Sequence, residues 1–122
     1  MGEMTTIEMN DGFALGAYTA SPEHGEAEGV IVVIQEIFGV NGHIKEVADG
    51  YASHGYMSIA PALFDRIEPD VQLGYTDADM ERGIELAFQG LHMDRTLQDL
   101  QSVVDYAATH GSVGVVGYCF GG

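Results

Sequence analysis

Basic residues and cysteine are scarce in this chain of 122 residues, whereas acidic residues are abundant. Four lysines and arginines stand against 19 aspartates and glutamates, which gives a formal net charge of −15. This balance disfavours nucleic acid and anionic membrane surfaces as partners, because both would repel the protein. The chain has one cysteine, so it cannot form an internal disulfide.

Long hydrophobic runs are also missing. The longest aliphatic run, Val30 to Ile34, is far shorter than the roughly 20 residues that a membrane-spanning helix needs. The N-terminus is acidic and lacks the basic and then apolar order of a secretory signal, so we expect a cytoplasmic protein. The sequence contains no cluster of cysteine and histidine, no P-loop and no glycine-rich dinucleotide fingerprint, so no metal or cofactor is expected.

The order of the predicted elements indicates an α/β fold with a mainly parallel sheet and flanking helices. Asp11-Gly12 predicts the turn of an N-terminal hairpin. The unbroken aliphatic run 30–34 is typical of a strand that is covered on both faces. The full expected series is strands 4–9, 13–19 and 30–34, helix 43–54, strand 56–60, a long loop 62–76, helices 77–90 and 94–109, and strand 113–118.

Helical periodicity predicts which side chains of the two later helices share a face. For the helix 77–90 the helical spacing joins the apolar residues Met80, Ile84, Ala87, Phe88 and Leu91. In 94–109 we expect a core stripe made of Leu97, Leu100 and Val104.

The last residues have the spacing of a nucleophile elbow, in which a strand turns sharply into a helix and exposes a nucleophile at the apex. A valine-rich run leads into Gly117-Tyr118-Cys119-Phe120-Gly121, with cysteine as the nucleophile. Gly117 and Gly121 fit the elbow because a Cβ at either position would press against neighbouring backbone. A lone cysteine is more often a small buried hydrophobe, but its place between the two glycines favours the reactive role.

A carboxylate, Glu36, comes almost directly after the aliphatic strand 30–34. It could form an ion pair or cap the next helix. Its position also allows a catalytic role, because residues that follow parallel strands gather at one edge of the sheet. Glu36 and Cys119 can therefore meet there although they are far apart in the sequence.

Two blocks, Gln35 to Asn41 (QEIFGVN) and Val116 to Gly122 (VGYCFGG), resemble the dienelactone hydrolase family of α/β hydrolases. The resemblance implies hydrolysis of a small ester or lactone, with Cys119 as the nucleophile that forms an acyl-enzyme. It implies that Glu36 helps to form the thiolate. It also implies an oxyanion hole made of the backbone N–H groups of Ile37 and Phe120.

The resemblance further implies that residues 1–122 form the N-terminal half of one hydrolase domain. In this family the Asp and His of the triad follow the nucleophile, whereas all five histidines here precede Cys119. The isolated chain is therefore expected to be inactive unless a complementing chain supplies the rest. Two alternatives remain open, namely a non-catalytic scaffold that acts by association and a redox-active cysteine.

Overall fold

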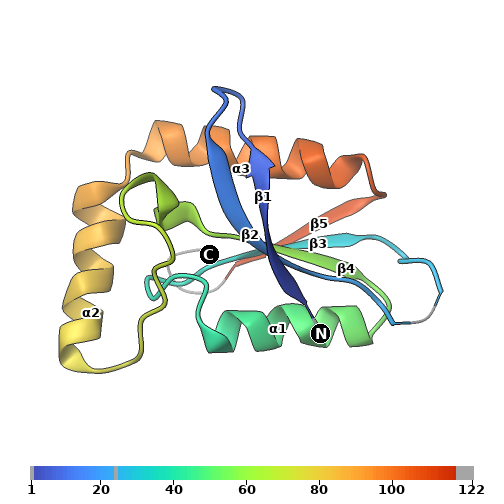
Figure 1. Ribbon diagram of the computed structural model, residues 1–122, viewed down its shortest axis with the longest axis horizontal. Coiled ribbons are helices and arrows are strands. Elements are labelled where there is room, and N and C mark those ends of the chain that lie inside the picture. Colours follow the sequence, from blue (N-terminus) through green and yellow to red (C-terminus); the bar gives the residue numbers. More distant parts are fainter. Residues whose placement is uncertain (1, 24, 118–122) are drawn as a thin grey trace.

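The computed structural model describes residues 2–23 and 25–117, and these form a five-stranded sheet in the order β1-β2-β4-β3-β5 (Figure 1). The hairpin strands β1 and β2 pair with each other in antiparallel fashion, and β2 pairs in the same way with β4. β3 is parallel to both of its neighbours, β4 and β5. The strands are β1 (Glu3–Glu8), β2 (Ala14–Ala20), β3 (Val30–Ile34), β4 (Met57–Pro61) and β5 (Val113–Gly117).

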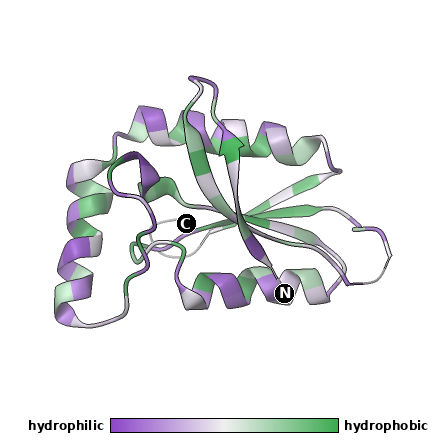
Figure 2. Cartoon of the chain, in the orientation of Figure 1, coloured by the Kyte–Doolittle hydropathy of each residue, from purple (hydrophilic) through white to green (hydrophobic). Residues whose placement is uncertain are grey.

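One long helix covers each face of the sheet, α1 (Gly42–Ser53) on one side and α3 (Met93–Ala108) on the other (Figure 1). Val30 and Val32 of β3 belong to a buried cluster that includes Val103 of α3. Val33 belongs to the cluster beneath α1. Alternate residues of β3 thus face opposite cores, and because both faces are buried, β3 has no polar residue. Figure 2 shows the central strands as hydrophobic and the helices as mixed.

The segment between β4 and α3 differs from its prediction. The expected loop 62–76 begins with a 3₁₀ helix, η1 (Leu63–Arg66). The expected helix 77–90 is an α-helix, α2 (Asp77–Ile84), followed by one turn of π-helix, η2 (Glu85–Gly90). Three apolar residues of this region are exposed rather than packed into the core, namely Met80 (42%), Ile84 (42%) and Phe88 (69%).

The predicted core stripe of α3 is correct at Leu100, which is partly buried and packs against the core, but wrong at Leu97. Leu97 is 55% exposed, and the buried face instead carries Thr96, Asp99, Val103 and Ala107. A pattern based on hydrophobicity misses this face because Asp99 counts as polar although it is only 2% exposed. A carboxylate is tolerated at such a position only when cations and hydrogen bonds compensate for the lost water.

Asp99 is compensated by two arginines. Arg66 donates to both of its carboxylate oxygens, from Nε at 3.0 Å and from Nη2 at 2.8 Å. Arg95, one turn earlier in α3, donates from Nε at 3.2 Å. Arg66 also makes a two-bond pair with Asp11 of the hairpin turn, at 2.8 and 2.9 Å, and lies over the ring of Phe13 at 4.3 Å. The network ties the hairpin turn, η1 and α3 together.

We expect Arg66→Ala to lower the free energy of unfolding by about 3 kcal/mol, because it removes the main partner of a buried carboxylate. Urea denaturation measures this loss. Arg82→Ala is the matched control, since Arg82 also pairs with two carboxylates, those of Glu68 and Glu85, but in an exposed position. Its loss should be clearly smaller, and equal losses would contradict the importance of burial.

Acid should weaken the same network. The hydrogen bonds from Arg66, followed by that from the Phe13 N–H, hold the pKa of Asp11 well below its ordinary value. A carboxylate with a lowered folded-state pKa stabilises the protein above about pH 4 and loses this effect as the pH falls toward the lowered value. The melting temperature of Asp11→Asn should therefore lie below that of the wild type at pH 7, with a gap that narrows below pH ~4. The same comparison is then made in proteins that also carry Arg66→Ala. If Asp11→Asn still lowers the melting temperature at pH 7 by the same amount, the ion pair between Asp11 and Arg66 is not the cause of the difference.

Candidate active site

The three parallel strands end at one edge of the sheet, and β3 and β5 end there in register. Ile34, the last residue of β3, pairs with Gly117, the last residue of β5. The segment 35–41 leaves the sheet at this edge. The predicted elbow glycine Gly117 thus lies beside the start of the Glu36 segment, whereas Cys119, Phe120 and Gly121 lie outside the described residues.

Gln35 is the first residue after β3, and its side chain is fully buried. Its Oε1 accepts a hydrogen bond from the Leu63 N–H at 2.9 Å. Its Nε2 donates to the Glu36 carbonyl oxygen at 3.1 Å. The amide therefore joins the end of β3 to the start of η1. In the sequence, the signal for this role is a polar residue directly after a buried aliphatic strand.

Glu36 begins a tight turn and is half-buried. The N–H of Gly39 donates to the Glu36 carbonyl at 3.2 Å, and Gly39 has a φ of +78°. A Cβ on Gly39 would lie 2.2 Å from the carbonyl oxygen of Val71, so this position requires glycine for both its backbone conformation and its space.

The two structural alternatives for the Glu36 carboxylate are not supported. Asn41, not Glu36, caps α1, by accepting a hydrogen bond from the Ile44 N–H at 3.2 Å. Within residues 2–23 and 25–117, the Glu36 side chain has no hydrogen-bond or ion-pair partner.

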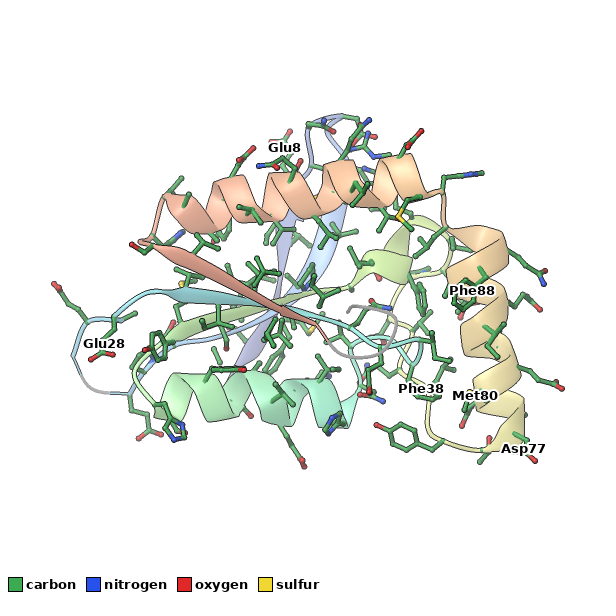
Figure 3. All side chains as sticks on the ribbon, turned by 180° about the vertical axis from the view of Figure 1, so that it is seen from behind. Glu8, Glu28, Phe38, Asp77, Met80 and Phe88 are labelled. Atoms are coloured by element: carbon green, nitrogen blue, oxygen red, sulfur yellow. The ribbon has the colours of Figure 1, made fainter. Side chains whose placement is uncertain are left out.

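Ile37 and Phe38 anchor the segment in a separate buried cluster formed with η1, the loop and η2. Phe38 packs edge to face against Tyr75, with 4.7 Å between the ring centroids. Figure 3 shows Phe38 on the side of the segment that faces α2. α2 approaches this segment so closely that a Cβ on Gly83 would lie 2.4 Å from the Ile37 carbonyl oxygen.

The loop 67–76 is pinned along the same segment. The Leu73 N–H donates to the Phe38 carbonyl at 2.9 Å. The Asn41 side chain donates to the Leu73 carbonyl at 3.0 Å and to the Tyr75 hydroxyl at 3.3 Å. The long loop therefore packs along the segment that follows β3.

The described part of the chain contains no group of three or more His, Cys, Asp or Glu side chains that could hold a metal ion. Within the same ranges, no helix has the length and apolarity needed to cross a bilayer.

The sheet is mixed, its three later strands are parallel, and it lies between two helical layers, with a carboxylate just beyond the end of β3 and a glycine at the end of the neighbouring β5. This arrangement is typical of an α/β hydrolase. The model of the dienelactone hydrolase family matches residues 15–122, and the chain belongs to this family.

Individual relatives agree with this assignment. The chain is 39% identical over 118 residues to a provisionally named carboxymethylenebutenolidase of Synechocystis sp., covering 93% of this chain and 48% of the relative. It is 35% identical over 124 residues to the carboxymethylenebutenolidase of Pseudomonas putida, covering 98% and 52%. A crystal structure of a provisionally named dienelactone hydrolase from Klebsiella pneumoniae superposes with a TM-score of 0.79 at 29% identity, covering 99% of this chain and 50% of that one. The chain thus spans about half the length of the relatives it matches.

Gly83→Ala tests the close approach of α2 to the site. The added methyl group must displace backbone, so we expect a loss of roughly 1–3 kcal/mol in the free energy of unfolding despite the better helix propensity of alanine. Gly50→Ala in α1 is the control, because a Cβ there meets nothing within 4 Å. It should stabilise the protein by up to about 1 kcal/mol. If urea denaturation shows that both substitutions stabilise, the tight contact does not exist.

Proposed function

We propose that this chain carries the nucleophile half of a hydrolase that cleaves a small ester or lactone through Cys119. One observation supports the proposal most directly, namely the pairing of Ile34 with Gly117. Glu36 and Cys119 each follow one of these paired residues by two positions in the sequence, and β3 and β5 end at the same edge of the sheet.

In the proposed reaction the Cys119 thiol gives its proton to the Glu36 carboxylate, and the thiolate attacks the substrate carbonyl. The C–O bond to the leaving oxygen breaks while that oxygen takes up the proton held by Glu36, which opens a lactone or releases an alcohol, and a thioester forms on Cys119. Water then hydrolyses this thioester to a carboxylic acid and returns a proton to the sulfur, which restores the thiol. The half-buried position of Glu36 suits a base, and a thiol of ordinary pKa, about 8.5, needs one at neutral pH.

The negative oxygen of the tetrahedral intermediate would be held by the N–H groups of Ile37 and Phe120. Each donor of this kind contributes roughly 3 kcal/mol to transition-state stabilisation. The N–H of Ile37 is suited to the role because the Ile37 side chain belongs to a buried cluster and Gly83 packs closely against the Ile37 carbonyl. Donors that are already fixed before the reaction cost no reorganisation when charge develops.

We propose that residues 1–122 form the N-terminal half of the hydrolase domain, because the matched relatives are about twice as long as the aligned part. The Asp and His of the triad then lie in the other half of that domain. The substrate class follows from the names of the relatives, which are carboxymethylenebutenolidases.

We expect Cys119→Ala to reduce ester hydrolysis by roughly 10³-fold or more, because the acyl-enzyme cannot form. Glu36→Gln should slow it by roughly 10²-fold, as expected for loss of a general base. The assay uses p-nitrophenyl acetate and the complete gene product that contains this chain. Mass spectrometry after rapid quenching should detect an acetyl group on the wild-type protein and none on Cys119→Ala.

Other outcomes identify the alternatives. Undiminished hydrolysis by Cys119→Ala would exclude the thiol mechanism. No hydrolysis by the wild type under any condition would favour a non-catalytic scaffold. A protein that forms an intermolecular disulfide or sulfenic acid with mild peroxide, but never an acyl adduct, would favour the redox role.

A further inference from the structure

We propose that Gln35 is a positioning residue for catalysis, which orients the peptide group between Glu36 and Ile37 so that its N–H points at the developing oxyanion. This inference rests on the function proposed above. It assigns to Gln35 a role that the geometry of its hydrogen bonds supports directly.

The peptide group between Glu36 and Ile37 is planar. The Glu36 carbonyl and the Ile37 N–H belong to the same trans peptide, so they point in opposite directions within one plane. Anything that fixes the direction of the carbonyl therefore fixes the direction of the N–H. This N–H is the proposed oxyanion donor.

The Glu36 carbonyl is held from two sides. It accepts the Gln35 Nε2–H at 3.1 Å and the Gly39 N–H at 3.2 Å. Rotation of the peptide would break both bonds. The turn alone would leave only the bond from Gly39.

Gln35 is itself immobile. Its side chain is fully buried, and its Oε1 accepts the Leu63 N–H at 2.9 Å. Moving the amide would leave buried polar groups unpaired on Gln35 and Leu63, which is costly. The direction of the Ile37 N–H is therefore set by the junction between β3 and η1.

Hydrogen bonds to a carbonyl also polarise the whole peptide group, which strengthens its N–H as a donor. Gln35 thus supports the proposed oxyanion hole through both orientation and polarisation. Neither effect requires Gln35 to touch the substrate.

The test compares Gln35→Met with Ser58→Ala in the complete gene product. Gln35→Met keeps the length of the side chain and removes both hydrogen bonds. Ser58 is the matched control because it is equally buried but donates to the Ala48 carbonyl at 2.7 Å, joining β4 to α1. Both variants lose hydrogen bonding by a buried side chain. Only Gln35→Met removes a hydrogen bond to the Glu36–Ile37 peptide group, so Ser58→Ala controls for the general cost of losing buried hydrogen bonding.

We expect kcat of Gln35→Met for p-nitrophenyl acetate to fall about 10- to 100-fold with KM within about threefold of wild type, because the weakened interaction exists only in the transition state. Inhibition by a trifluoromethyl ketone, which adds to the thiol and carries an oxyanion, should weaken by a similar factor. Ser58→Ala should keep both values within about threefold of wild type.

Gln35→Glu provides a second readout and serves if Gln35→Met does not fold. It keeps the acceptor for the Leu63 N–H but, when ionised, lacks the donor to Glu36. Protonation restores a donor, so the ratio of its kcat to that of wild type should rise as the pH falls. A ratio that is independent of pH, or that falls with it, would contradict the proposal.

The outcomes separate this inference from the proposed function. If hydrolysis survives Cys119→Ala, the proposed function fails. If hydrolysis depends on Cys119 but Gln35→Met matches Ser58→Ala in kcat, or raises KM alone, then Gln35 is only structural or binds substrate and this inference fails by itself.

Discussion

The burial of β3 on both faces and along both edges is the constraint on which the rest of the structure depends. Val30 and Val32 face the core beneath α3, Val33 faces the core beneath α1, and β4 and β5 pair on either side. Such a strand has no position for an unpaired polar side chain. Polar chemistry can begin only where the strand ends, which is why Gln35 and Glu36 come there. Burial also gives the two residues different requirements. The buried Gln35 needs hydrogen-bond partners for both the oxygen and the nitrogen of its amide, whereas the half-buried Glu36 does not need a protein partner for its carboxylate.

The short helix η1 connects the candidate site with the remote ionic network. Its first residue, Leu63, donates its N–H to Gln35, and its last residue, Arg66, pairs with Asp11 and Asp99. The hairpin turn and α3 are thereby coupled to the position of the segment that follows β3. Buried, bidentate charge pairs are directional, so this arrangement defines where η1 lies more sharply than hydrophobic packing would.

Close backbone contact completes the support of the site. Gly39 and Gly83 allow two further elements, the loop at Val71 and the helix α2, to approach the Glu36–Ile37 turn without an intervening side chain. Catalytic groups must be held within a fraction of an ångström of their working positions. Packing of backbone against backbone meets this need because backbone atoms cannot change rotamer. The exposed apolar residues Met80 and Ile84 of α2 and Phe88 of η2 lie in the helical segment that makes the contact at Gly83.

Much of this architecture was determined by local sequence. The aliphatic run of β3 and the Asp-Gly turn predict their elements because each depends on residues close in the chain. The motifs around Glu36 and Cys119 predict the family. The cap at Asn41 was not predicted. Tertiary structure alone decided the η1 helix, the π-helical turn of η2 and the buried face of α3, because Asp99 is buried only when Arg66 and Arg95 reach it from other turns. It also decided the role open to Gln35. A hydrogen bond between residues 28 positions apart, such as that from Leu63 to Gln35, leaves no periodic trace in the sequence, since it depends on two strand ends meeting in space.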